Sequence, residues 1–147
     1  MVPAGAFEGR EHVLPVRVYY EDTDFTGVVY HASYLRFFER GRTEFLRAIG
    51  VEHAALLTLP VPCAFAVTKL TVQFRKAARV DDALQVRTAY SQRRGVRIVA
   101  GQRIVREEEL ICEAEVEVVC IDLAGRPRRP PRELWDPLAP LLSDAPS

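Results

Sequence analysis

Two carboxylates, Asp22 and Asp24, stand close together early in the chain, and Gly27 and His31 follow them. Their polar segment leaves a strand-like run and leads into the only long helix that the sequence pattern predicts. Helix N-termini carry unpaired N–H groups and a partial positive charge. A carboxylate beside such an end could act as a base or nucleophile while the N–H groups polarise a carbonyl, a pairing suited to acyl transfer. Asp-rich loops before helices also serve as turn and capping residues, and that interpretation stays open here.

The helix is predicted over residues 34–49, where apolar side chains recur at helical spacing. Ser33 is the expected N-cap, and Gly50 is expected just beyond the C-terminus. The preceding strand is expected over residues 14–20, where Val16, Val18 and Tyr20 alternate with other residues. A glycine within the apolar stripe, Gly41, suits a helix that lies against a sheet.

Four further strands are expected over residues 64–74, 84–90, 96–105 and 110–121. The short links between them favour antiparallel neighbours in a meander. The order of elements predicts an α+β fold, with one antiparallel sheet covering one helix.

The chain is expected to hold one domain over residues 14–130. Residues 1–13 are expected to form a loose leader, and residues 131–147 a tail that could contain a short helix. Residues 1–13 also lack the apolar segment of a signal peptide, and the apolar runs fall short of the ~18 residues that span a bilayer. A cytoplasmic location is therefore expected.

The composition argues against some classes of protein. Lys and Arg number 20 and so do Asp and Glu, and this balance argues against a dedicated nucleic-acid binder, although not against a local basic patch. Cys63, Cys112 and Cys120 lack the spacing of zinc sites. We expect buried thiols, no bound metal and no cofactor.

The segment from Tyr19 to Arg40, YYEDTDFTGVVYHASYLRFFER, closely resembles the signature of the 4-hydroxybenzoyl-CoA thioesterase-like hotdog family. It looks most like the bacterial acyl-CoA thioesterases associated with the Tol-Pal envelope system. The resemblance extends over about residues 14–130, and beyond the signature it rests mainly on the strand pattern. It implies a hotdog fold, in which the sheet wraps one long helix. It also implies hydrolysis of an acyl-CoA to free acid and CoA.

The resemblance also implies roles for single residues. Asp24, the second Asp of the Asp-x-Asp element, is the expected catalytic carboxylate, which either activates water or attacks the thioester directly. The backbone N–H of His31 is the expected oxyanion donor, Gly27 lets the backbone approach the substrate, and Tyr30 is expected to contact it. The imidazole of His31 either assists proton transfer or is a local hydrogen-bonding group. Asp22 is expected to shape the loop.

The phosphates of CoA call for cationic side chains. Arg93 and Arg94 lie in a predicted turn, and Arg126, Arg128 and Arg129 follow the last strand. Arginine suits phosphate because its fork donates two hydrogen bonds. A solvated charged turn is the alternative for each cluster.

Other titratable side chains receive less specific expectations. His12 and His53 are expected on the surface. Glu39 is expected to pair with Arg36 or Arg42, and the alternative is a second catalytic carboxylate.

The family implies subunits that pair so that active sites form between them. We expect a homo-oligomer, a tetramer built as a dimer of dimers. Carrier-protein thioesters are an alternative to acyl-CoA as substrates. Two other functions stay open: a hotdog dehydratase or hydratase, and a non-catalytic acyl-CoA-binding or envelope-scaffold protein.

Overall fold

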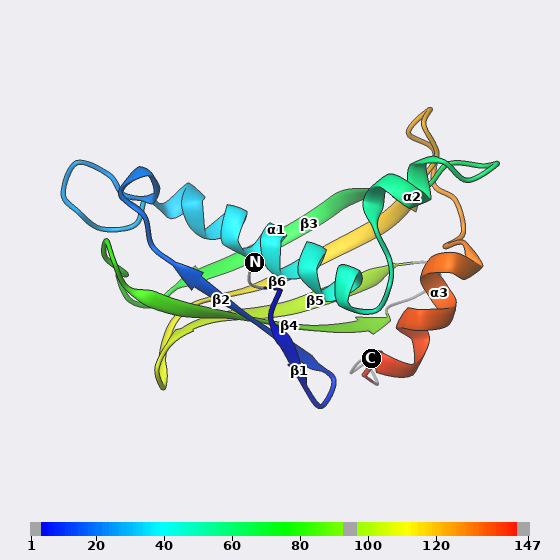
Figure 1. The fold of residues 1–147 in the computed structure, drawn as a ribbon. Helices are drawn as coiled ribbons and strands as arrows, with labels where there is room; N and C mark the ends of the chain where they lie inside the picture. Colours follow the sequence, from blue (N-terminus) through cyan, green and yellow to red (C-terminus); the bar gives the residue numbers. More distant parts are fainter. Residues whose placement is uncertain (1–3, 93–96, 144–147) are drawn as a thin grey trace.

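The computed structural model describes residues 4–92 and 97–143. These residues form a six-stranded antiparallel sheet that curves around helix α1 (Figure 1). The predicted α+β hotdog architecture is confirmed. The strands are β1 (Ala6–Glu8), β2 (Glu11–Arg17), β3 (Ala64–Phe74), β4 (Ala83–Gln92), β5 (Ile98–Arg106) and β6 (Glu109–Ile121). The helices are α1 (His31–Ala48), α2 (His53–Leu57) and α3 (Arg132–Leu138), with short 3-10 turns η1 (Tyr20–Asp22) and η2 (Ala139–Leu141).

Helix α1 begins three residues earlier than predicted and ends one residue earlier, at Ala48. Its N-cap is Tyr30, so Ser33 lies buried inside the first turn and the assignment of Ser33 as cap was wrong. At the other end Gly50 has φ +85° and donates to Arg47 O, while Val51 donates to Leu46 O. This is the Schellman arrangement, which needs a left-handed residue at that position.

Gly41 lets α1 lie close against the sheet. A Cβ added there would lie 2.7 Å from Cγ1 of Val86 and 2.9 Å from Oγ1 of Thr88. Thr88 accepts a hydrogen bond from Gln102, which also donates to Phe38 O. The helix is therefore tied to the sheet by packing and by a buried polar network.

The predicted meander was wrong at one strand. The sheet order is β1-β2-β4-β5-β6-β3, so β3 pairs with β6 and not with β4. Strand β2 occupies the edge of β4 that β3 would need. Strand β3 therefore becomes a sheet edge, paired along one side only.

Midway along β3, the alternation of its side chains between the two faces of the sheet shifts by one residue. A register shift between Val67 and Lys69 makes Thr68 an extra residue, the geometry of a β-bulge. Before the shift, Phe65 and Val67 lie opposite buried residues of β6, and after it the same face carries Leu70, Val72 and Phe74. A strand without the bulge would place Ala66 and Thr68 on this face, whereas the shift puts Phe65 and Val67 there.

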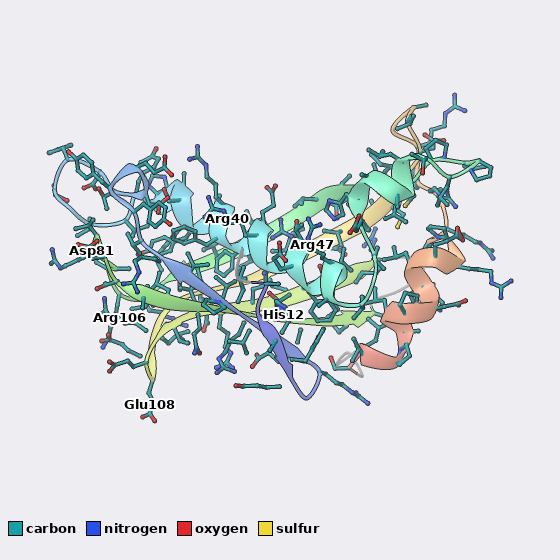
Figure 2. All side chains as sticks on the ribbon, in the orientation of Figure 1. His12, Arg40, Arg47, Asp81, Arg106 and Glu108 are labelled. Atoms are coloured by element: carbon teal, nitrogen blue, oxygen red, sulfur yellow. The ribbon has the colours of Figure 1, made fainter. Side chains whose placement is uncertain are left out.

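The N-terminal segment is not a loose leader where the structure describes it. Strands β1 and β2 form a hairpin, and β2 covers part of the expected leader and ends at Arg17. His12, expected on the surface, is fully buried between this hairpin and α1 (Figure 2), with its ring 5.2 Å from that of Phe7 and 6.2 Å from that of Phe45. The hairpin extends the sheet beyond β4 and, together with α1, removes His12 from solvent.

Candidate active site

The loop before α1 is a tight backbone hairpin that projects beyond the helix (Figure 1). Thr23 and Val29 form a bridge, and Asp24 N donates to Val28 O at 2.9 Å. Val29 N also donates to Ala78 O at 2.8 Å, which anchors the loop to the link between β3 and β4. This anchoring fixes Asp24 near the tip of the loop.

The carboxylate of Asp24 is held through one of its oxygens. Oδ1 accepts hydrogen bonds from Thr26 N at 2.7 Å and from Thr26 Oγ1 at 2.6 Å. The hydroxyl of Thr26, followed by its backbone N–H, holds the pKa of Asp24 below its usual value. Both bonds go to Oδ1, so neither uses Oδ2. The arrangement provides an ionised carboxylate with a fixed orientation.

The neighbouring carboxylate, Asp22, is buried and makes different hydrogen bonds from those of Asp24. Its side chain is buried, and Oδ2 accepts a hydrogen bond from Tyr19 N at 2.8 Å. Its backbone carbonyl accepts from Tyr30 N at 2.9 Å. Asp22 thus joins the two ends of the loop, which is the shaping role expected of it.

The other expected site residues gather at the same end of α1. Gly27 has φ +86° and donates to Asp24 O at 3.2 Å, so this glycine closes the turn in a left-handed conformation. Tyr30 and His31 are exposed, their rings lie 4.5 Å apart, and the His31 ring lies 6.3 Å from that of Phe74 on β3. His31 opens the helix, where backbone N–H groups lack intrahelical partners.

Exposed aromatic side chains surround this loop. Phe25 is 100% exposed, Tyr20 83% and Tyr19 61%. Large apolar side chains at such exposure mark surfaces that meet a ligand or another protein when they lie together. The sequence contains these aromatic residues, but only the structure shows that their side chains are exposed.

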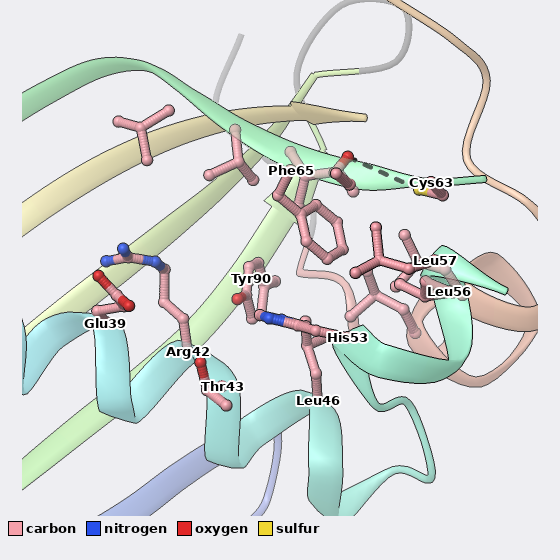
Figure 3. Close-up of a pocket in the computed structure, with 16 residues that line it drawn as sticks. Glu39, Arg42, Thr43, Leu46, His53, Leu56, Leu57, Cys63, Phe65 and Tyr90 are labelled. Carbon is pink, nitrogen blue, oxygen red and sulfur yellow. Dashed lines mark hydrogen bonds between the residues drawn. The ribbon is translucent and has the colours of Figure 1, made fainter. Parts of the chain in front are cut away.

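A cavity lies at the opposite end of α1 (Figure 3). It has a volume of about 400 Å³ and lies between α1, α2, the first half of β3 and α3. Glu39 and Arg42 of α1 lie at one side of it, and Tyr90 of β4 points into it (Figure 3). Glu39 was expected to pair with Arg36 or Arg42. The Arg42 guanidinium instead donates to Gln102 Oε1, at 3.0 Å, and burial lowers the pKa of Arg42.

Comparison with known proteins gives consistent matches over most of the chain. The model of the thioesterase-like superfamily matches residues 18–140. The chain belongs to this superfamily. Acyl-CoA thioester hydrolase YbgC of Escherichia coli O6:H1 is 51% identical over 82% of this chain and 90% of its own.

Other proteins similar to this chain are also named thioesterases. Acyl-CoA thioesterase YbgC of Haemophilus influenzae is 48% identical over 74% of this chain and 79% of its own. The solved structure of the probable thioesterase of Bartonella henselae superposes with a TM-score of 0.79 at 41% identity, over 82% of this chain and 99% of that one.

Two of the arginines predicted to bind phosphate, Arg128 and Arg129, lie away from the Asp24 loop within one copy. Arg93 and Arg94 lie outside the described residues. Arg128 donates to the backbone carbonyls of Val61 and Pro62, which gives it a structural use. The β6–α3 link that carries Arg128 and the exposed Arg129 lies at the far end of the sheet from the Asp24 loop (Figure 1).

Metal sites and membrane spans are absent from the described part of this thioesterase-like protein. Residues 4–92 and 97–143 contain no group of three His, Cys, Asp or Glu side chains that could hold a metal ion. In the same ranges, no helix has both the length and the hydropathy to cross a membrane.

Helix α2, and with it the cavity, was missed in the sequence. The apolar run at residues 54–57, between Gly50 and Pro60, was an available signal for a short helix. The three cysteines, by contrast, are free and buried as predicted.

Proposed function

We propose that this protein hydrolyses acyl-CoA thioesters and that Asp24 is its catalytic carboxylate. The observation that carries the assignment is the contrast within the loop. The buried carboxylate of Asp22 accepts a hydrogen bond from Tyr19 N. The carboxylate of Asp24 accepts its hydrogen bonds through Oδ1 only and has a lowered pKa. The names of the relatives, acyl-CoA thioester hydrolase and acyl-CoA thioesterase, support the reaction.

The reaction needs a base or nucleophile and a site for the oxyanion. As a general base, Asp24 takes a proton from water as the water oxygen attacks the thioester carbonyl. As a nucleophile, it forms a mixed anhydride that water then hydrolyses. In both routes the carbon–sulfur bond breaks, the CoA thiolate leaves and is protonated, and the free acid remains.

The other proposed site residues lie at or just before the N-terminal end of α1. The first-turn N–H of His31 is the proposed oxyanion donor, because helix starts offer unpaired N–H groups and positive potential. Gly27 keeps the loop turn compact, and Tyr30 and the His31 imidazole lie exposed beside it, where a substrate could reach them. Phosphate contacts by Arg93, Arg94 and Arg129 stay predictions, and Arg128 is a weaker candidate because its guanidinium is occupied.

We also propose that two copies pair through β3. This edge strand is 11 residues long and exposes Val67 by 52%, Leu70 by 42% and Phe74 by 50%. Long apolar edges pair readily with another strand. The opposite edge, β1, has only three residues. A second pairing to a dimer of dimers stays a prediction.

We infer a cytoplasmic location, because the cysteines are free and reducing compartments keep thiols in that state. Acyl-CoA is the proposed substrate, and carrier-protein thioesters are the second candidate.

A thiol-release assay tests this function. Purified protein is given a panel of acyl-CoA thioesters, and free thiol is read with a dye while enoyl-CoA hydration is followed by absorbance. We expect thiol release and no hydration. Hydration without thiol release would point to the hydratase alternative, and binding without either product would point to a scaffold.

A further inference from the structure

Tyr34 places a hydroxyl group in the core where α1 meets the β3–β4 link, residues 75–82. The side chain lies in the helical turn after His31 and is buried, and its oxygen accepts a hydrogen bond from Ala78 N at 3.0 Å. Ala78 is itself buried, at 0% exposure. A buried backbone N–H needs a partner, and the Tyr34 hydroxyl supplies it.

Ala78 connects Tyr34 to the loop that carries Asp24. The carbonyl of Ala78 accepts a hydrogen bond from Val29 N at 2.8 Å, and Asp24 N donates to Val28 O at 2.9 Å. The link lies beside the projecting loop (Figure 1). One peptide unit of the link is therefore held by α1 on one side and by the Asp24 loop on the other.

Other bonds of the link reach the sheet rather than α1. Arg106 of β5 donates to Ala77 O at 3.2 Å and pairs with Asp82 at 2.7 Å. These bonds fix residues 75–82 to the strands. Within residues 4–92 and 97–143, the hydrogen bond of Tyr34 is the one that ties the link to α1.

The connection matters because the proposed site has two parts. The first turn of α1 carries the proposed oxyanion donor, the N–H of His31, and the loop carries the carboxylate of Asp24. Tyr34 lies three residues beyond His31, roughly 4.5 Å along the helix axis. A displacement of about 1 Å between reacting groups can cost about a hundredfold in rate. A bond that fixes the loop relative to the helix therefore bears on turnover.

We propose that Tyr34 is a positioning residue, whose hydroxyl acts through Ala78 to hold the Asp24 loop in place relative to the oxyanion end of α1. Tyr34 is buried and takes no part in proton transfer. The inference rests on the proposed thioesterase function and adds to it a residue remote from the reacting atoms.

Tyr34→Phe tests this role because it removes the hydroxyl and keeps the ring. The ring packs 6.3 Å from that of Phe37 and 5.8 Å from that of Phe74, measured between centroids, so the fold should be retained. Ala78 N loses its partner, and the loop is less firmly held. We expect kcat for thiol release to fall on the order of tenfold, with KM largely kept.

The pH profile separates positioning from a change in the chemistry of Asp24. Thr26 still donates both of its hydrogen bonds to Asp24 in this variant. Burial raises the pKa of Tyr34, so its hydroxyl stays neutral over the acid limb. The acid limb of the kcat/KM profile should therefore keep its position in Tyr34→Phe. A shifted limb would show that the hydroxyl tunes the carboxylate instead, and would overturn the positioning role.

Thr88→Val is the matched control. Thr88 is fully buried beneath the middle of α1, and its hydroxyl accepts a hydrogen bond from Gln102 Nε2 at 2.8 Å. Both variants remove one buried hydroxyl acceptor beside α1, but the bond of Thr88 lies away from residues 75–82. We expect urea unfolding to show a comparable loss of stability in both and kcat to fall in Tyr34→Phe alone. Equal falls in kcat would reduce Tyr34 to a stabilising residue.

Amide hydrogen exchange measures the path itself. The N–H groups of Asp24 and Val29 should exchange faster in Tyr34→Phe than in wild type, and at wild-type rates in Thr88→Val. Wild-type exchange at both amides in Tyr34→Phe would overturn the path. No thiol release from any thioester by the wild-type protein would reject the proposed function. Normal wild-type release with unchanged kcat in Tyr34→Phe would reject the positioning role alone.

Discussion

The two ends of α1 have opposite chemistry. At the N-terminal end, Asp24 is ionised and partly exposed in a hydrogen-bonded loop, with exposed aromatic side chains around it. At the C-terminal end, α2 and α3 cover an apolar cavity whose wall includes the buried Leu56, Leu134 and Leu138. One end suits bond breaking and the other suits the binding of an apolar chain.

The separation has a physical reason. An apolar cavity raises the pKa of a carboxyl group because burial disfavours its charged form. Asp24 avoids this effect in the loop, where the hydrogen bonds of Thr26 lower its pKa instead. An apolar chain gains most from burial where no charge must be desolvated with it. Two copies of one chain satisfy both demands if each supplies a different end.

Separating the two copies should have the largest effect among the tests of this comparison. Leu70→Arg puts a charge in the middle of the β3 edge, where Leu70 is 42% exposed. We expect monomers in light scattering and a loss of activity on the order of a hundredfold, comparable to loss of a general base. The control is Leu123→Arg, away from the edge. A fully active monomer would show that one copy contains a whole site.

The close packing of the middle of α1 against the sheet, at Gly41, should be the next most sensitive feature. Gly41→Ala places a Cβ 2.7 Å from Cγ1 of Val86, so we expect the free energy of unfolding to fall by about 1–3 kcal/mol, as in overpacked cores. Gly101→Ala is the matched control, because its nearest atom would lie at 3.8 Å. Urea unfolding measures both variants, and equal stabilities would contradict the close packing.

The buried His12, beside Phe7 and Phe45, predicts a pH-dependent stability. Its Nε2 lies 3.0 Å from Ala4 O, while Nδ1 is buried and has no hydrogen-bond partner among the residues that the structure describes. Burial lowers the pKa of His12, against the opposing effects of the Ala4 carbonyl and Glu44. The unfolded chain therefore binds the proton more readily, and stability falls as the pH drops below about 6.5.

Unfolding at two pH values measures this effect. His12→Phe removes the titrating group and keeps a ring beside Phe7 and Phe45. The loss of unfolding free energy between about pH 7.5 and about pH 5.5 should be smaller in this variant than in wild type. An unchanged loss would show that other groups account for the acid sensitivity.

The smallest expected effect concerns the tuning of Asp24. Thr26→Val removes the hydroxyl that contributes most to the lowered pKa of Asp24 and leaves the backbone bond. The acid limb of the kcat/KM profile should move to higher pH, because the carboxylate protonates more readily. Thr23→Val is the control, since its hydroxyl donates to Tyr20 O. Identical acid limbs in the two variants would remove Thr26 from this role.

Much of the fold could be predicted because its signals are local. Strand β3 has the predicted bounds, and the Gly50 end of α1 followed from a glycine after an apolar stripe. The start of α1 could not be predicted so well, because Tyr30 is fixed by its bond to Asp22 O rather than by a capping side chain. The bulge at Thr68 left no clear local signal.

The features of the site also differ in whether sequence alone could predict them. Asp24 stands in a contiguous motif, so sequence alone could single it out. The burial of His12 depends on the β1–β2 hairpin, which joins the sheet beside β4, a strand distant in sequence. The cavity joins residues as far apart in sequence as Glu39 and Leu138. Neither feature has a local pattern that would have shown it.

The most direct test of the account compares two carboxylates of one loop. Asp24→Asn and Asp22→Asn are both nearly isosteric changes, and the side-chain carbonyl introduced by Asp22→Asn could still accept from Tyr19 N. We predict that Asp24→Asn lowers kcat for thiol release at least about a hundredfold with KM largely kept, whereas Asp22→Asn has a milder effect. Full turnover by folded Asp24→Asn, with loss of turnover in Asp22→Asn, would contradict the assignment of Asp24.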